Sequence, residues 1–160
     1  MDYFQGVVAD YLRADRAVFV NTECCIQLNP GANPDTSGSH WYCDAVAVNL
    51  RDRAVFLCEV TYSKTLDALI NRLSGWNQNW SLVLAALVRD LSVPAEWPVR
   101  PWLFIPEERN ALLEQKLASF RVPSDDSTRM PRPKVTFLEA ITPWKYNSWN
   151  RQPDKRNGDA

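Results

Sequence analysis

Two acidic side chains lie in otherwise apolar segments of this 160-residue chain. Asp44 belongs to the run 42–50 and Glu59 to the run 54–62, and both runs are rich in Val, Ala, Leu, Phe and Cys. This composition is typical of strands that are covered on both faces. Acids are rare in such strands unless they are paired or bind a metal. These two positions are therefore the first candidates for a functional site.

The expected pairing of the two strands brings these acids together. If Arg51 and Asp52 form a two-residue hairpin turn, Asp44 faces Glu59. Facing residues of an antiparallel pair have Cβ atoms about 4.5–5.5 Å apart, whereas a slip of one residue would put them on opposite faces. Two carboxylates so placed repel unless one stays protonated or a cation lies between them. Mg²⁺ suits two carboxylates that leave room for water and phosphate.

Two further polar residues follow Glu59 along the chain. Strand alternation places Thr61 on the same face as Glu59. Lys64 comes where the next helix is expected to begin, and a positive charge in a first helical turn opposes the helix dipole. Its ammonium could instead stabilise negative charge on a bound phosphate or help to orient a water.

The order of these residues has a counterpart in a known family. Asp44, followed fifteen positions later by Glu59 and then Thr61, with Lys64 just after, resembles the PD-(D/E)xK nuclease superfamily, which has the restriction-endonuclease-like fold. The resemblance implies that Asp44 and Glu59 bind Mg²⁺ or Mn²⁺ and that a lysine assists catalysis. Thr61 occupies the usual lysine position, with Lys64 the nearest replacement, and Cys43 replaces the proline before the first acid. The superfamily also includes inactive members that only bind.

Composition predicts an ordinary globular protein. Hydrophobic residues make up 46% of the chain and the net charge is −1, which argues against a chain that coats nucleic acid without a local basic groove. No apolar run reaches the roughly 18 residues of a membrane span and no signal peptide is recognised, so we expect a cytoplasmic protein without membrane contact. The four cysteines lack paired CxxC spacing, which favours buried small hydrophobes over disulfides or a zinc site with His40.

Hydrophobic periodicity predicts one α/β domain over residues 1–149 and a disordered tail over 150–160. The expected fold is a mixed sheet of about five strands flanked by helices, in the order α-β-β-β-α-β-α-β, which matches the restriction-endonuclease-like core. Its expected elements are a helix at 2–14, strands at 17–28, 42–50 and 54–62, a helix at 65–91 with a bend or break near Ser74-Gly75, a strand at 99–105, a helix at 107–121 and a strand at 135–141.

Other residues have competing interpretations. Asp10 could supply an acid from the first helix or be a solvated surface residue. Glu23 and Gln27 share a strand face, and Gln27 could lie near the acids. The loop 29–40 could be a flap over a substrate groove, and His40 at its end could contact phosphate or be plain polar surface.

The segment 142–160 mixes aromatic and basic residues, including Trp144, Tyr146 and Trp149 with Lys145 and Arg151. Such a mixture can bind single-stranded nucleic acid by charge and stacking. The alternative, which we favour, is that the aromatic side chains fasten the segment to the body.

Three functional hypotheses follow. The first is a metal-dependent DNA phosphodiesterase in which Asp44, Glu59, Thr61 and Lys64 form the site, acting as a homodimer or within a larger assembly. The second is an inactive nuclease-fold domain that binds protein or nucleic acid. The third is an unrelated α/β domain in which Arg72 or Lys64 neutralises the two acids.

Overall fold

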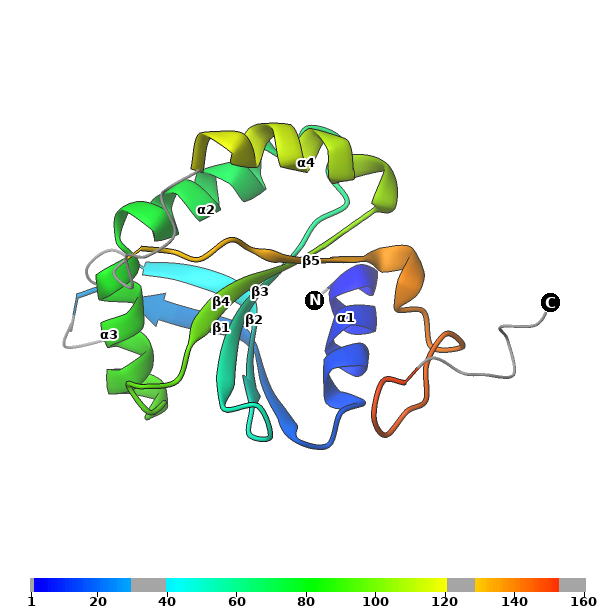
Figure 1. Ribbon diagram of the computed structural model, residues 1–160, viewed down its shortest axis with the longest axis horizontal. Coiled ribbons are helices and arrows are strands. Elements are labelled where there is room, and N and C mark those ends of the chain that lie inside the picture. Colours follow the sequence, from blue (N-terminus) through cyan, green and yellow to red (C-terminus); the bar gives the residue numbers. More distant parts are fainter. Residues whose placement is uncertain (1, 30–39, 121–128, 153–160) are drawn as a thin grey trace.

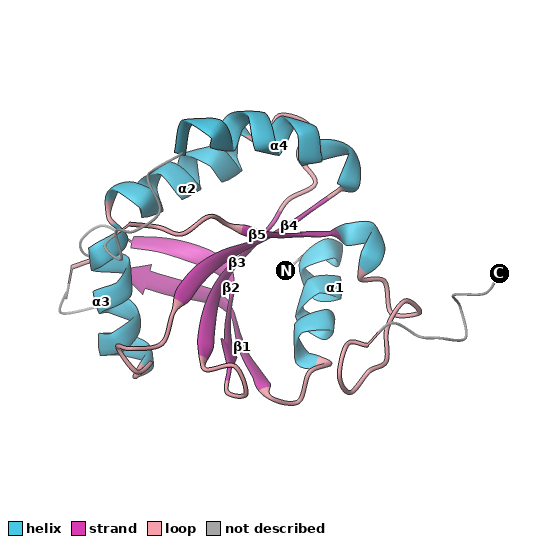
Figure 2. Cartoon of the chain, in the orientation of Figure 1, coloured by secondary structure: helices cyan, strands magenta, loops and turns pink. Residues whose placement is uncertain are grey.

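The computed structural model describes residues 2–29, 40–120 and 129–152, and its core is a mixed sheet between two layers of helices (Figure 1). The elements, coloured by type in Figure 2, are α1 (Tyr3–Arg13), β1 (Val18–Gln27), β2 (His40–Asn49), β3 (Ala54–Val60), α2 (Asp67–Gln78), α3 (Trp80–Leu91), β4 (Val99–Ile105), α4 (Asn110–Leu117) and β5 (Lys134–Phe137), with short 3₁₀ turns at Glu107–Arg109, Ala118–Phe120 and Leu138–Ala140. None of the helices in these ranges is long and apolar enough to cross a membrane.

The sheet has the strand order β1-β2-β3-β4-β5. β2 is antiparallel to both of its neighbours, whereas β3, β4 and β5 are parallel. Parallel neighbours need crossover connections, and the segments containing α2, α3 and α4 supply them. The predicted α/β class with a mixed five-stranded sheet flanked by helices is confirmed.

Each face of the sheet has its own apolar core. Helices α2, α3 and α4 cover one face around Leu73, Trp76 and Leu113. Helix α1 covers the other face, where Leu12 packs near Phe104 of β4. We refer to these as the α2 face and the α1 face. Strands covered on both sides explain the near-continuous apolar runs of the sequence.

The hairpin of β2 and β3 has the predicted register but a different turn. Asn49 pairs with Ala54, so residues 50–53 form a four-residue connection instead of a two-residue turn. Arg53 adopts a left-handed φ of 52°, and the Asn49 side chain bonds both the backbone N–H and the carboxylate of Asp52. Lengthening the turn by one residue on each side leaves the strand register unchanged.

The long helix predicted at 65–91 is two helices. The break falls at Asn79 and not near Ser74-Gly75, because the Asn79 backbone leaves the helical region with φ −119° and ψ 25°, while its side-chain amide donates to the Gly75 carbonyl. α2 also begins later than expected, at Asp67, because Leu66 adopts a left-handed φ of 61°. Lys64 therefore lies in the loop 61–66 and not in a helical turn.

Two other boundaries differ from expectation. The strand predicted at 135–141 ends at Phe137 and continues as a 3₁₀ turn, and the helix predicted at 107–121 is a short α4 between two 3₁₀ turns. Most of the flap predicted at 29–40 lies outside the described residues, which omit 30–39. Most of the tail predicted at 150–160 also lies outside them, because 153–160 are omitted.

Candidate functional site

The alternation of side chains along β2 reverses at Asp44. Ala45 and Ala47 belong to the core of the α1 face, whereas Cys43 belongs to the core of the α2 face. Residues two apart on a regular strand point to the same face, so the exchange occurs between Cys43 and Ala45. Asp44 lies at the exchange, and this position allows it to contact elements from both layers.

The neighbouring strand reverses at the matching position. Val18 of β1 packs in the α1-face core and Cys24 packs in the α2-face core, although both have even numbers. Glu23 has a left-handed φ of 53° between them, and the register places it opposite Asp44. A positive φ is unfavourable for a residue with a Cβ, and such strained positions cluster at functional sites.

Asp44 is held by one hydrogen bond from each side. The Gln5 side-chain amide, on α1, donates to Oδ1 at 2.9 Å, and the Val60 backbone N–H, at the end of β3, donates to Oδ2 at 2.8 Å. Gln5 is itself fixed by a capping box with Asp2 at the start of α1. Regular backbone pairing between β2 and β3 stops at Ala45. One residue beyond it, the Asp44 carboxylate takes the place of a backbone carbonyl and accepts the hydrogen bond from β3.

Glu59 is the buried member of the acid pair, with a relative exposure of 6%. Its Oε1 accepts a hydrogen bond from Nη1 of Arg72, on α2, at 3.1 Å, and the same Nη1 also donates to the Tyr42 carbonyl. Burial and then the charge of Asp44 raise the pKa of Glu59 to about 8, although Arg72 acts in the opposite direction. The site thus has more negative charge than one guanidinium offsets, and it favours either a proton or a further cation.

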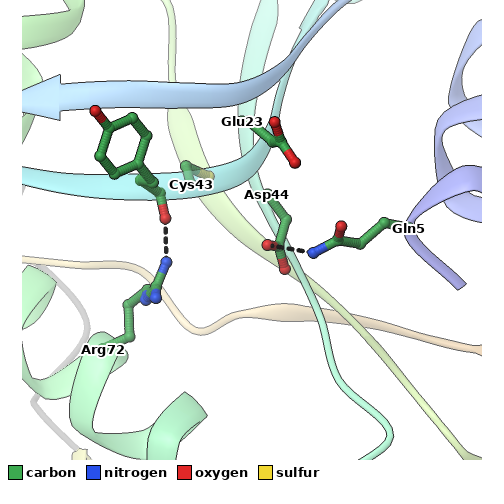
Figure 3. A pocket seen from close by; sticks show the side chains of 6 residues that line it. Gln5, Glu23, Cys43, Asp44 and Arg72 are labelled. Atoms are coloured by element: carbon green, nitrogen blue, oxygen red, sulfur yellow. Dashed lines mark hydrogen bonds between the residues drawn. The ribbon is translucent and has the colours of Figure 1, made fainter. Parts of the chain in front are cut away.

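A cavity of about 420 Å³ opens beside Asp44 (Figure 3). Its lining comes from four elements of the fold, namely α1, β1, β2 and α2, through Gln5, Glu23, Tyr42, Cys43, Asp44 and Arg72. In Figure 3 the Glu23 and Asp44 carboxylates extend to the same side of the strands, with the Gln5 amide directed at Asp44. Two acids, an amide and a guanidinium therefore face one polar space.

Three of the four predicted site residues do not line this cavity, and one of them, Glu59, is buried and joined to the cavity wall by its ion pair with Arg72. Thr61 Oγ1 accepts a hydrogen bond from the Ser63 backbone N–H at 3.1 Å, and Lys64 is exposed in the loop 61–66. The cation that contacts Glu59 is Arg72, which the sequence analysis considered as a neutralising partner of the acid pair. Of the four predicted site residues, the structure brings together Asp44 and Glu59.

Other candidates from the sequence lie elsewhere. Asp10 is exposed and close enough to Tyr146 to raise the pKa of its phenol, after the larger effect of burial, so Gln5 is the α1 side chain that lines the cavity. His40 begins β2, where it pairs with Gln27 and its ring meets the Tyr42 ring edge-on at 5.8 Å. Neither His40 nor Gln27 lines the cavity.

The cysteines are free thiols, as predicted. Three of them, Cys24, Cys43 and Cys58, are buried, and the Cys43 thiol donates to the carbonyls of Ala45 and Cys58. Burial raises the pKa of Cys43 and Cys58, which disfavours the thiolate that a zinc ligand or nucleophile requires.

Metal binding at the cavity would depend on few ligands. Across residues 2–29, 40–120 and 129–152, no group of three or more His, Cys, Asp or Glu side chains is arranged to hold a metal ion. Mg²⁺ requires only one or two carboxylates, because water and substrate phosphate complete its coordination. Asp44 and Glu59 fit that donor chemistry, and burial and then the charge of Asp44 raise the pKa of Glu59.

Comparison with known proteins gives no family for this chain. No protein-family model matches it, and no curated protein matches it. The functional argument therefore depends on the cavity and on the acids beside it.

Proposed function

We propose that the chain is a metal-dependent phosphodiesterase of the PD-(D/E)xK type that acts on DNA. The observation that carries the proposal is the pair Asp44 and Glu59: Asp44 lines a polar cavity, and Glu59 is buried beside Asp44 and bonded to Arg72, which also lines the cavity. The order of elements, with three strands before the first crossover and parallel strands after it, supports assignment to the restriction-endonuclease-like fold.

Asp44 and Glu59 would hold the divalent ion, Mg²⁺ or Mn²⁺. Such an ion, when bound, lowers the pKa of a water and polarises a phosphate oxygen. The Gln5 amide and the Val60 N–H fix the direction of the Asp44 carboxylate, so its lone pairs do not have to be reoriented when a ligand arrives.

Arg72 takes the role that the family gives to a lysine. Its side chain is about one-third exposed, contacts Glu59 and lines the cavity, so its remaining N–H groups can bind a phosphate oxygen. A guanidinium stays protonated at every physiological pH, which suits it to stabilising charge and not to accepting a proton. Lys64 and Thr61 remain candidates for supporting contacts from the loop outside the cavity.

The first test combines metal binding with cleavage. Isothermal titration with Mg²⁺ and with Mn²⁺, and cleavage of supercoiled plasmid in the same samples, would be compared for wild type, Asp44→Asn and Glu59→Gln. We expect both variants to lose metal binding and to reduce cleavage at least about 100-fold, the size of loss typical when a group that stabilises the transition state is removed. Glu114→Gln, an exposed acid outside the cavity, is the matched control and should cleave like wild type.

A wild-type protein that binds neither ion and leaves the plasmid intact would overturn the proposal. The second candidate, an inactive nuclease-fold domain that binds DNA or protein, would then be favoured. Its specific support is the ion pair between Arg72 and Glu59, which offsets part of the acidic charge without a metal. DNA binding that persists without cleavage in either metal would identify this alternative.

A further inference from the structure

Three aromatic side chains gather at the surface where α1 begins and β3 ends. The rings of Phe4 and Tyr62 stack with centroids 4.6 Å apart and an interplanar angle of 8°, and the Tyr3 ring meets Phe4 edge-on at 5.2 Å. Tyr3 is 71% exposed and Tyr62 is 55% exposed. Because Phe4 covers one face of Tyr62, its exposed area lies mainly on the opposite face and the ring edge. We call these three residues the aromatic platform.

The aromatic platform adjoins the candidate site through both of its segments. Phe4 precedes Gln5, whose amide bonds Asp44 at 2.9 Å. Tyr62 follows two residues after Val60, whose N–H bonds the other Asp44 oxygen at 2.8 Å. Two residues of extended chain span about 7 Å, so the platform backbone lies close to the acid that would bind the metal.

The loop that carries Tyr62 also carries positive charge. Lys64 is exposed two residues further on, and Nε of Arg109 donates to the Ser63 carbonyl at 3.3 Å. Glu108 pairs with Arg109 at 3.2 Å and offsets part of that charge. An open aromatic face beside two cations matches the combination by which proteins bind single-stranded nucleic acid, with stacking for the base and charge for the backbone.

We infer that the aromatic platform stacks a base of single-stranded DNA, with Lys64 and Arg109 beside the adjoining phosphates. The choice of DNA rests on the proposed phosphodiesterase function. An unpaired strand is required because the bases of a duplex present only their edges to a protein, whereas stacking on Tyr62 needs an open base face. The inference makes single-stranded or locally unpaired DNA the substrate class.

Binding without metal separates this inference from the nuclease proposal. Fluorescence anisotropy in EDTA would compare a labelled dT oligonucleotide with a duplex of equal length. We expect tighter binding of the single strand, a loss of about five- to 100-fold for Tyr62→Ala, and near wild-type affinity for Tyr62→Phe, which keeps the ring. Trp144→Ala removes a 63% exposed aromatic residue that is not part of the platform, and should bind like wild type.

Equal affinity of Tyr62→Ala and wild type, an equal loss for Trp144→Ala, or preference for the duplex would overturn the inference. Thermal melting of each variant checks folding, and Tyr62→Phe distinguishes loss of the ring from loss of the hydroxyl. Plasmid cleavage with Mg²⁺ in a protein whose Tyr62→Ala variant binds normally would retain the nuclease and remove the platform. Binding that depends on Tyr62, without any cleavage, would retain the platform and remove the nuclease.

Discussion

Asp15 and Glu59 are both buried acids paired with arginine, yet their surroundings shift their pKa values in opposite directions. Asp15 is 5% exposed and accepts two hydrogen bonds from Arg51, at 2.8 and 2.9 Å, one from Arg151 at 3.1 Å and one from the Ala17 N–H at 3.0 Å. The hydrogen bonds from Arg51 hold the pKa of Asp15 well below its usual range, despite the opposing effect of burial.

Glu59 has a similar relative exposure, 6%, but negative charges outnumber positive charges around it. One guanidinium, that of Arg72, contacts it, and the second carboxylate of the site, Asp44, lies beside it. Two arginines serve one acid at Asp15, whereas one arginine serves two acids at the cavity. The comparison shows that the acid with two arginine partners fastens the fold, whereas the acid beside a second carboxylate, whose pKa is raised first by burial and then by that charge, is the one available to a ligand.

The largest expected effect on stability is at Asp15, the acid that fastens the fold. Asp15→Ala leaves Arg151, whose side chain is 13% exposed, without its carboxylate, and we expect the free energy of unfolding to fall by about 3–5 kcal/mol. Urea denaturation at pH 7 measures this. Arg51→Ala is the control, because its side chain is 60% exposed and Arg151 still pairs with Asp15, so a clearly smaller loss is expected. Equal losses in the two variants would contradict the importance of Arg151.

The next effect concerns the pH dependence of stability. The folded pKa of Glu59 is about 8 against an ordinary 4.5, so between these values the native state binds more protons than the unfolded chain and stability falls as pH rises. The limiting slope is about 1.4 kcal/mol per pH unit, and relaxation around the buried charge reduces it. We expect a loss of roughly 2–3 kcal/mol between pH 5 and pH 8 in EDTA.

Glu59→Gln should remove most of that slope, and denaturation of both proteins across the pH range measures the difference. Added Mg²⁺ should restore stability to wild type near pH 8 but not to the variant, because the metal replaces the missing positive charge. A wild-type curve as flat as that of Glu59→Gln would show that Arg72 alone compensates both acids.

The smallest effect is expected at Gln5. Gln5→Ala removes the bond to Asp44 and half of the capping box, so we expect a loss of about 1–2 kcal/mol of stability and weaker Mg²⁺ binding. Asp2→Ala removes the cap and leaves the Gln5 amide available to Asp44, so it should lose stability without losing metal affinity. Titration calorimetry on the two variants separates the positioning role of Gln5 from its capping role.

Sequence reasoning succeeded where the governing interactions are local. The β2–β3 hairpin was predicted in the correct register because both strands and their short connection lie within 21 residues, 40–60. The strand at Val99–Ile105 was predicted at its observed bounds because its apolar run is delimited by polar and Pro-containing segments.

The rest of the cavity depends on contacts between distant segments. Glu23 faces Asp44 only through the β1–β2 pairing, which no short turn fixes, and its left-handed backbone has no sequence signal for a glutamate. The Gln5 amide on α1 reaches Asp44 across 39 positions, and Arg72 reaches Glu59 only through the packing of α2 against the sheet. The local sequence pattern therefore predicts the two acids but not the side chains that surround them.

The change of side-chain faces at Glu23 and Asp44 divides the sheet into two parts. Beyond this point β1 and β2 pair only with each other, because the β2–β3 ladder ends at Ala45, so residues 24–27 and 40–43 form a two-stranded arm. The arm supplies Tyr42 and Cys43 to the cavity wall, whereas Glu59 belongs to the fixed body of the sheet. Arg72, which donates both to the Tyr42 carbonyl and to Glu59, ties the arm to that body, as does Arg89 of α3, which donates to the Gln27 carbonyl.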